Sequence, residues 1–470
     1  MDERAKRRVL VAVMLAIFLA AIESTVVALA MPTVVASLGG IRFYSWVFSG
    51  YLLTQTVTMP LWGRFSDLYG RRPVYLVGLA TFLAGSALSG AAQSMTQLIA
   101  FRMVQGLGAG SLMTLGYTII GELFGLERRA RLQGYLSGVW GVASMVGPPV
   151  GGLLTDHLSW RWVFYMNVPF GAVAMALIAT ALSSETRPVR RPTIDWRGVA
   201  CFTAGIVLVM LAFVEAGREA AWSGSGVLGP LAAGALALAA FVAVERRAAE
   251  PIVPLGLFAS RMLVAAVLTR SLAAMAMFGA LAFVPLFVQS VTGASATRSG
   301  AVLVPFVLGW VALSATSARL VLRVGYRGVV IAGVACLTGS FLLLARWDAG
   351  LSLVGAMRDV LLAGIGMGLV IVPMLIAVQS AVPRSELGIA TSVIQFFMSI
   401  GGALGVSVMG TVMAQRLASG HALVDALHGV FVTGLVVCGG ALASSLLVPA
   451  GRAQDLARAE MRGEPTRAGG

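Results

Sequence analysis

Long apolar runs, separated by short polar segments, are the feature of this sequence that most restricts its fold. About 20 apolar residues are enough to cross the hydrocarbon layer of a membrane as an α-helix. Fourteen such runs cover residues 9–33, 43–62, 73–92, 98–120, 132–155, 162–183, 197–214, 227–244, 263–289, 300–319, 329–345, 355–378, 389–413 and 428–449. Of the 470 residues, 58% are hydrophobic and 11% are charged, against about 25% charged in a soluble domain. We therefore predict an all-α polytopic membrane protein.

The distribution of arginine and lysine predicts the orientation of the chain. If the N-terminus is cytoplasmic, the inner segments hold 25 of the 34 basic residues and the outer loops hold 6. Because basic residues concentrate on the cytoplasmic side, we expect a multi-pass protein of the plasma membrane with both termini in the cytoplasm. This bias accounts for the net charge of +14, so we expect no nucleic-acid partner. The first apolar run is longer than that of a signal peptide and is predicted to be the first span.

The sequence contains an internal repeat. Residues 102–110 and 358–368 each place an arginine before a Gly-x-Gly-x-Gly pattern, in the fourth run of a set of six. Two six-helix halves related by a parallel repeat are common in secondary transporters. We predict one six-helix bundle at 1–183, a second at 263–449, a cytoplasmic linker with two inserted spans at 184–262, and a cytoplasmic tail at 450–470.

Only one carboxylate lies near the middle of a predicted span. This residue is Glu23, while the other acidic residues lie in loops, in the tail or at span ends. Burial among apolar groups disfavours the charged form of a carboxylate, and ionisable residues inside membranes are usually functional. Glu23 is therefore predicted to carry a proton; the alternative is a static carboxylate that pairs with arginine or hydroxyl groups. Asp359 stands beside Arg358, which predicts a local ion pair.

Three longer patterns are rich in small residues, and two of them also contain charged residues. Residues 63–72 read GRFSDLYGRR, and the carboxylate of Asp67 could pair with arginine or cap a helix N-terminus in the other half. Residues 98–110 include Arg102 inside a span, where a charge costs at least about 2.5 kcal/mol, so its side chain should find a partner or reach the surface. Residues 134–152 place small residues on one helix face, which allows close helix packing.

These patterns resemble those of the major facilitator superfamily, and specifically its fourteen-helix drug:proton antiporter group. Residues 63–72 match the loop motif GxxxDxxGRR, residues 134–152 resemble the antiporter motif with Ala143 in place of glycine, and residues 23–32 resemble a drug-antiporter pattern with Glu23 in place of aspartate. The resemblance implies proton coupling by Glu23 and Arg102. It also implies gating by Gly63, Asp67, Gly70, Arg71 and Arg72, and exporter-type packing by Gly134, Gly147, Pro148, Gly151 and Gly152.

The predicted function is that of a proton-coupled antiporter that exports lipophilic, cationic drugs or other toxic compounds by alternating access. Polar and aromatic residues inside the spans outline a candidate substrate cavity: Tyr51, Gln55, Tyr117, Trp140, Phe278, Gln289, Trp310 and Gln395. The expected partners are protons, a small lipophilic substrate and the lipid bilayer, with a monomer as the functional unit. The proton gradient supplies the energy, and no cofactor is expected. No nucleotide site is expected, since no GxxxxGK[ST] motif occurs, and no metal site, since the three histidines have no metal-ligand spacing.

Other interpretations remain open at this stage. The same scaffold could export an endogenous lipid, metabolite or siderophore. A membrane-embedded enzyme is disfavoured, because no cluster of catalytic carboxylates or histidines lies near one membrane face. Arg270 could either reach the membrane surface or face the cavity. The two inserted spans have no partner in the repeat, so we expect them to lie at the periphery of the transport pathway.

Overall fold

The computed structural model describes residues 1–40, 43–183, 195–219, 222–248, 251–294, 296–348 and 350–450, and all regular structure in this part of the chain is helical. Most of the predicted linker and the predicted tail lie outside the described residues. The helices are α1 (Glu3–Leu38), α2 (Tyr44–Tyr69), α3 (Arg71–Gly90), α4 (Met95–Leu123), α5 (Leu126–His157), α6 (Trp162–Tyr165), α7 (Asn167–Ala181), α8 (Trp196–Glu219), α9 (Ser225–Glu245), η2 (Leu255–Ala259), α10 (Arg261–Thr292), α11 (Ala296–Ala301), α12 (Val304–Val324), α13 (Tyr326–Leu344), α14 (Leu353–Ser380), η3 (Arg384–Glu386), α15 (Leu387–Ala418) and α16 (Leu423–Ser445).

Helices occupy every predicted span, but not all of them have the composition of a membrane span. Among the described residues, twelve helices are long and apolar enough to cross a membrane, and α2 and α5 are not among them. The physical reason is their polarity: α2 carries three threonines and a glutamine over residues 54–58, and α5 begins with three arginines over residues 126–131. Fourteen spans are therefore not supported by composition. The protein is an all-helical, multi-pass membrane protein with twelve candidate spans.

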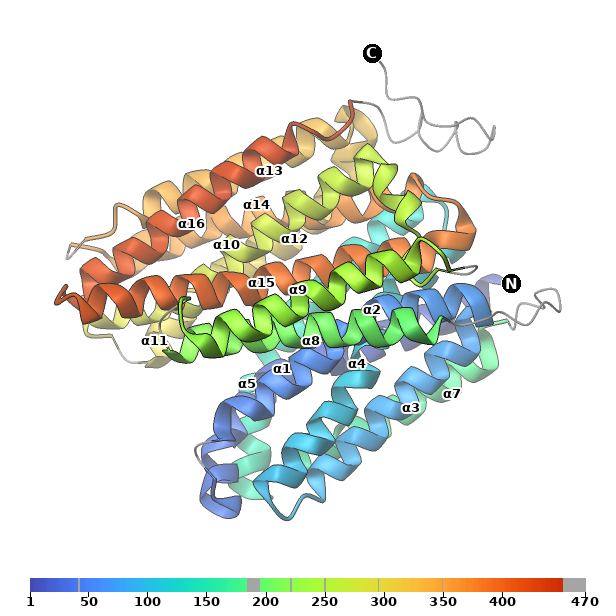
Figure 1. Ribbon diagram of the computed structural model, residues 1–470, viewed down its shortest axis with the longest axis horizontal. Coiled ribbons are helices and arrows are strands. Elements are labelled where there is room, and N and C mark those ends of the chain that lie inside the picture. The colour runs from blue at the N-terminus through green and yellow to red at the C-terminus, as the bar shows by residue number, and fades with distance from the viewer. Residues whose placement is uncertain are drawn as a thin grey trace. The chain divides into compact units, whose positions relative to one another are not determined.

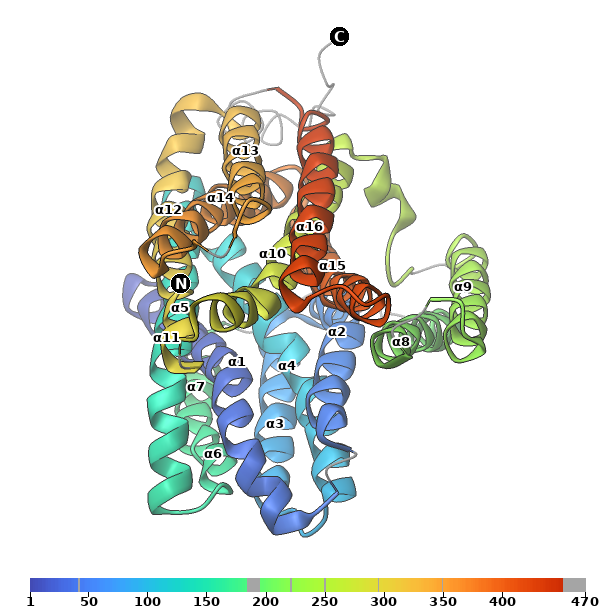
Figure 2. The same ribbon diagram turned by 90° about the vertical axis from the view of Figure 1, so that its left-hand side faces the viewer.

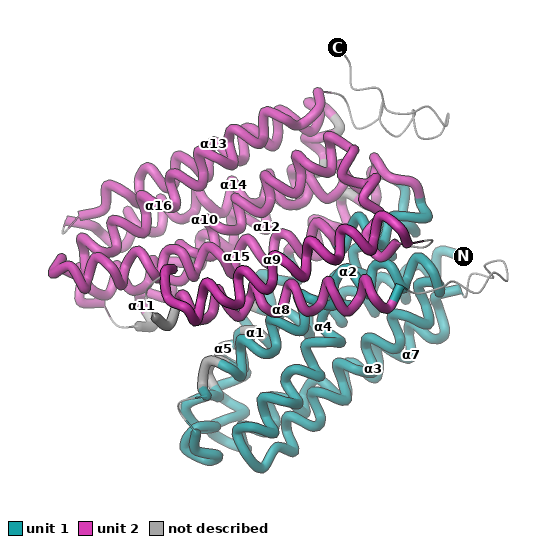
Figure 3. The backbone as a smooth tube through the Cα atoms, viewed as in Figure 1, with its two compact units in different colours: residues 1–125, 138–195, 384–392 teal, residues 126–137, 196–383, 393–470 magenta. Residues whose placement is uncertain are grey.

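The chain divides into two compact units, which are coloured separately in Figure 3. Unit 1 contains residues 1–125, 138–195 and 384–392, and unit 2 contains residues 126–137, 196–383 and 393–470. Helices α5 and α15 each contribute to both units. The inserted helices α8 and α9 group with unit 2, so the division follows contacts rather than the predicted boundaries at 183 and 263.

The same helix pairings occur in both units. In unit 1, α4 packs against α2 and α3, and α1 packs against α4 and α7. In unit 2, α14 packs against α12 and α13, and α10 packs against α14 and α16. Figures 1 and 2 show α12, α13 and α14 running side by side. These matched pairings are those that a six-helix repeat produces.

Glycines at matching positions explain how these helices approach so closely. A Cβ atom on Gly106 of α4 would collide with the backbone of α2, and one on Gly364 of α14 would collide with the backbone of α12. Gly70 and Gly325 end α2 and α12 with φ of 92° and 87°, a conformation that favours glycine. The repeated sequence pattern thus has the same packing role in each unit.

Candidate functional site

A buried ion pair lies inside unit 1. Glu23 of α1 and Arg102 of α4 are each 1% exposed, and Arg102 Nη1 lies 2.5 Å from Glu23 Oε1. Asn167, the first residue of α7, donates from Nδ2 to Glu23 Oε2 at 2.6 Å. Both carboxylate oxygens therefore accept hydrogen bonds, which is how a buried charge is stabilised.

The surroundings of Arg102 hold its guanidinium inside the unit. Nη1 also donates to Gln105 Oε1 at 2.8 Å, and Nε donates to the Val47 carbonyl at 3.4 Å. The guanidinium carbon lies 4.1 Å from the centre of the Tyr51 ring, within cation–π range. The structure thus brings three predicted site residues together (Glu23, Arg102 and Tyr51), and Arg102 does not extend to the surface.

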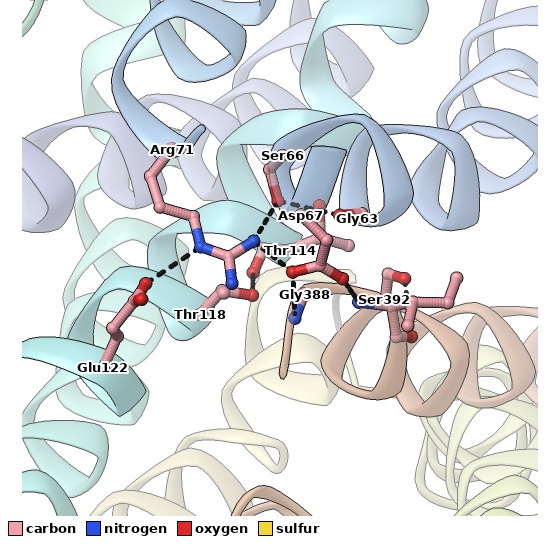
Figure 4. Close-up of polar contacts among 10 residues, drawn as sticks. Gly63, Ser66, Asp67, Arg71, Thr114, Thr118, Glu122, Gly388 and Ser392 are labelled. Carbon is pink, nitrogen blue, oxygen red and sulfur yellow. Dashed lines mark hydrogen bonds and ion pairs between the residues drawn. The ribbon is translucent and has the colours of Figure 1, made fainter. Parts of the chain in front are cut away.

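A second charged cluster joins the end of α2 to the start of α15 within unit 1. Asp67 Oδ2 accepts from the Ile389 backbone N–H at 2.8 Å, and Oδ1 accepts from the Gly388 backbone N–H at 3.1 Å. Arg71 pairs with Asp67 and, through Nε, with Glu122 Oε2 at 2.9 Å. Figure 4 shows Arg71 between these two carboxylates. Asp67 therefore makes both interactions that its sequence pattern allowed: an arginine pair and a helix N-terminal cap.

Close backbone contact accompanies this cap. A Cβ atom on Gly63 would collide with the Gly388 carbonyl and the Ser392 side chain, and one on Gly388 would collide with the Gly63 carbonyl. The two glycines let α2 and α15 approach until the Asp67 carboxylate reaches the first turn of α15. Arg72, the remaining charged residue of the motif, is partly exposed at the start of α3.

The antiporter motif on α5 is used for packing in two places. Within unit 1, Gly147 and Gly151 face Thr25 and Val26 of α1, close in sequence to Glu23. Within unit 2, Gly134 faces the backbone of α12 at Ala315. Gly152 has nothing within 4 Å of its Cβ position, and the side chain of Pro148 lies outside the described ones.

Unit 2 contains a polar contact between α5 and α14 that the sequence analysis did not identify. Arg129 Nη2 donates to Ser380 Oγ, and Gln133 Nε2 donates to Gln379 Oε1 at 2.6 Å. All four side chains are buried. Arg129 and Gln133 lie in the first turns of α5, and Gln379 and Ser380 lie in the last turn of α14. At that end of α14, the arginine also complements the negative end of the helix dipole.

The other predicted residues are divided between the units. Gln55, Tyr117 and Trp140 lie in unit 1, and Phe278, Gln289, Trp310 and Gln395 lie in unit 2. The substrate cavity therefore stays a prediction.

Two further charged side chains can be placed within unit 2. Arg270, 1% exposed, is buried inside this unit, and its Nη2 donates to Gln395 Oε1 at 2.7 Å. Asp359 pairs with Arg358 at 2.8 Å, as its sequence position predicted, and also accepts from Trp347 Nε1 at 2.9 Å.

Two groups of residues at these sites were missed by sequence reasoning. Asn167 lies within the predicted span at 162–183, where an amide by itself indicates no role; the signal available was that no other asparagine occurs in the chain. Arg129 and Gln133 fell within or beside a basic loop, where a positive charge is expected in any case. Only a three-dimensional structure pairs them with residues 379–380.

Comparisons with known proteins agree with this architecture. Residues 13–406 match the Major Facilitator Superfamily. The chain is 38% identical over 428 residues to the multidrug transporter protein MdtP of Bacillus subtilis (strain 168), covering 90% of this chain and 78% of that protein. It is 35% identical to multidrug resistance protein 3 of the same organism, covering 86% of this chain and 79% of that protein.

A solved structure resembles the fold at low sequence identity. The human organic anion transporter MFSD10 superposes with a TM-score of 0.68 at 19% identity. The superposition covers 95% of this chain and 100% of that chain. At this identity the likeness concerns the fold alone. The family match over residues 13–406 and the relatives at 35–38% identity show that the chain belongs to the Major Facilitator Superfamily and is a membrane transporter rather than an enzyme.

Proposed function

We propose that this protein is a proton-coupled exporter of lipophilic, cationic drugs or other toxic compounds, in the fourteen-helix drug:proton antiporter group. The relatives named as multidrug proteins support drug efflux. The observation that carries the coupling mechanism is the buried Glu23–Arg102 pair, in which a carboxylate and a guanidinium lie 2.5 Å apart inside one bundle.

Proton exchange at Glu23 is the proposed energy-coupling step. In the ionised state, Arg102 and Asn167 stabilise the carboxylate. Protonation of Glu23 cancels its charge and removes the attraction to Arg102, so the two protonation states favour different arrangements of α1 and α4. A cationic substrate near Glu23 would favour the ionised state, and proton and substrate would compete for the same carboxylate.

Alternating access requires contacts that break and re-form between the two halves of the repeat. We propose that the Asp67 cap on α15 is such a contact and acts as a gate. Asp67 and Arg71 are both buried here, and a buried ion pair that loses one partner is strongly destabilised. The contact therefore favours one state until substrate or proton binding offsets it.

The membrane arrangement belongs to the same proposal. We propose that α2 and α5 cross the membrane with the twelve candidate spans, because their polar residues face protein partners rather than lipid: Thr54 of α2 donates to the Met103 carbonyl of α4, and Gln133 of α5 to Gln379. Fourteen spans place both termini on the cytoplasmic side of the plasma membrane. We also propose that the functional unit is a monomer.

The test is transport in proteoliposomes with an imposed pH gradient and a panel of dyes and drugs. Wild-type protein should move lipophilic cations in the direction opposite to proton flow. Glu23→Gln should lose at least about tenfold of this rate, because glutamine cannot carry the proton and leaves the buried Arg102 charge unpaired, which costs several kcal/mol. Asp425→Asn, which neutralises an exposed carboxylate at the start of α16, is the control. Wild-type coupling in Glu23→Gln would contradict the proposal. Cells that lack the protein offer a second test. If they lose an envelope component but do not become sensitive to drugs, an endogenous substrate is favoured instead.

A further inference from the structure

Asn167 occupies an unusual position in this chain. It is the only asparagine among 470 residues, and its side chain is fully buried at the start of α7. Its amide nitrogen Nδ2 donates two hydrogen bonds, to Glu23 Oε2 at 2.6 Å and to Ser86 Oγ at 2.9 Å. Both amide protons of Asn167 are therefore used in the arrangement that the structure shows.

The surrounding hydrogen bonds fix which end of the amide faces Glu23. An ionised carboxylate only accepts hydrogen bonds. Ser86 Oγ donates its own proton to the Phe164 carbonyl at 2.8 Å, so it can only accept from Asn167. Both neighbours therefore require the NH₂ end, and the carbonyl oxygen Oδ1 points elsewhere.

That oxygen is buried and has no hydrogen-bond partner among the described residues. A buried polar group without a partner is destabilising, and such groups often mark a functional constraint. An amide carbonyl is an acceptor, which is what an ionised carboxylate cannot use and what a protonated carboxylic acid requires.

The other side chains facing Glu23 are donors or already accept a hydrogen bond, apart from the Tyr51 hydroxyl, which is buried without a partner among the described residues. Arg102 from α4 is a donor only and stays charged. Gln105 Oε1 already accepts from Arg102, and Tyr51 from α2 presents its ring to the guanidinium. Arg102 and Tyr51 are the charged and titratable neighbours of Glu23, and among its hydrogen-bond partners Asn167 carries both a donor and an idle acceptor.

We propose that Asn167 is a positioning residue that holds Glu23 in both of its protonation states; this inference rests on the proposed function, in which Glu23 takes up and releases a proton. In the ionised state, Nδ2 donates to Oε2. When Oε2 carries the proton, a half-turn of the amide about its Cβ–Cγ bond brings Oδ1 to accept from that O–H. Ser86 can follow, because its hydroxyl can turn from the Phe164 carbonyl to Oδ1.

A direct measurement of Glu23 protonation tests this inference without relying on transport. Dicyclohexylcarbodiimide reacts with protonated carboxyl groups, and mass spectrometry of the Glu23 peptide gives labelling as a function of pH. Asn167→Leu removes donor and acceptor together. The midpoint of labelling should move up by about one pH unit, because the charge-assisted bond to the carboxylate is about twice as strong as the neutral one.

Two further variants keep the test decisive. Asn167→Ala should give the same shift, and it applies if the larger leucine prevents folding, as judged by size-exclusion chromatography. Ser89→Ala, which removes a buried hydroxyl that bonds only within its own helix to the Gly85 carbonyl, should leave the midpoint unchanged.

Infrared difference spectra, with Glu23→Gln as the subtraction, test the acceptor role itself. The protonated Glu23 carbonyl band should lie at higher wavenumber in Asn167→Leu than in wild type, because its O–H loses the Oδ1 acceptor. Either an unchanged labelling midpoint or an unchanged band would overturn the inference, because the midpoint tests the Nδ2 donor and the band tests the Oδ1 acceptor. If Glu23→Gln still transports with proton coupling but the midpoint and band shift, then the proposed function fails and the Asn167 inference stands.

Discussion

The carboxylate of Asp67 accepts a hydrogen bond from the backbone N–H of Ile389 at 2.8 Å, although the two residues are 322 positions apart in the chain. Ile389 lies in the first turn of α15, where backbone N–H groups have no partner within the helix. A negative charge at this end of a helix contributes up to about 2 kcal/mol when partly buried. One side chain of the first half of the repeat thereby binds the start of a helix of the second half.

Neutralising this cap should disturb transport more than folding. In Asp67→Asn, an amide oxygen can still accept from the α15 N–H groups, but the charge that attracts the helix end and Arg71 is gone. We expect the contact to weaken by about 1–3 kcal/mol and the transport rate to fall several-fold at normal expression. Cysteine introduced at Ser392 in a cysteine-free background should react faster with a maleimide. Wild-type turnover with unchanged cysteine reactivity would argue against a gating role.

The α5–α14 contact of unit 2 leads to a parallel prediction. Arg129→Gln removes the charge that bonds Ser380 at the end of α14, and we expect a loss of about 1–3 kcal/mol for a buried charged hydrogen bond. Thermal unfolding in detergent should begin at a lower temperature, and transport should slow. Arg131→Gln, at an exposed position two residues further along α5, is the matched control. Equal stability of the two variants would show that the contact is dispensable.

The sequence could predict part of the Glu23 cluster and part of the Asp67 cluster. Glu23 and Asp67 were identifiable because an isolated mid-span carboxylate and a complete loop motif are local signals. Other partners were not: Asn167 is 144 positions from Glu23, and Ile389 is 322 positions from Asp67, so nothing local relates them. The apolar runs located all the long helices, since burial in lipid requires such runs. They did not settle the number of spans, because helices packed within protein tolerate polar residues.

The antiporter motif offers a comparison within a single helix. Gly147 of α5 lies against Thr25 of α1, whereas Gly152 has open space at its Cβ position. Gly147→Ala should therefore force α5 and α1 apart at a cost of about 1–3 kcal/mol, lowering both thermal stability and transport. Gly152→Ala should retain both, with a gain of up to about 1 kcal/mol from helix propensity. A similar loss in both variants would mean that the motif responds to flexibility rather than to space.

The inserted helices are attached to unit 2 by a small set of contacts. Figure 2 shows α8 and α9 side by side, with α8 next to α15. Ser407 and Thr411 of α15 donate to the Phe213 and Ala216 carbonyls of α8, at 2.7 and 3.3 Å. The Phe202 ring of α8 lies 5.4 Å from that of Phe396 of α15. These contacts join α8 to α15, and we predict that they brace the insert at the periphery of the transport pathway.

Removing the two hydroxyl groups should therefore loosen the insert without affecting transport. The double variant Ser407→Ala and Thr411→Val loses two interhelical hydrogen bonds. Each such bond contributes about 0.6 kcal/mol or more, so the loss should cost about 1–2 kcal/mol. The unfolding temperature should therefore fall. The transport rate should stay within about twofold of wild type. Thr316→Val is the control, because the Thr316 hydroxyl donates to the Ala312 carbonyl of its own helix. Two results would refute this assignment and place the insert in the pathway. One is labelling of α8 or α9 by a photoreactive substrate, with protection by excess substrate. The other is a selective loss of transport in the double variant.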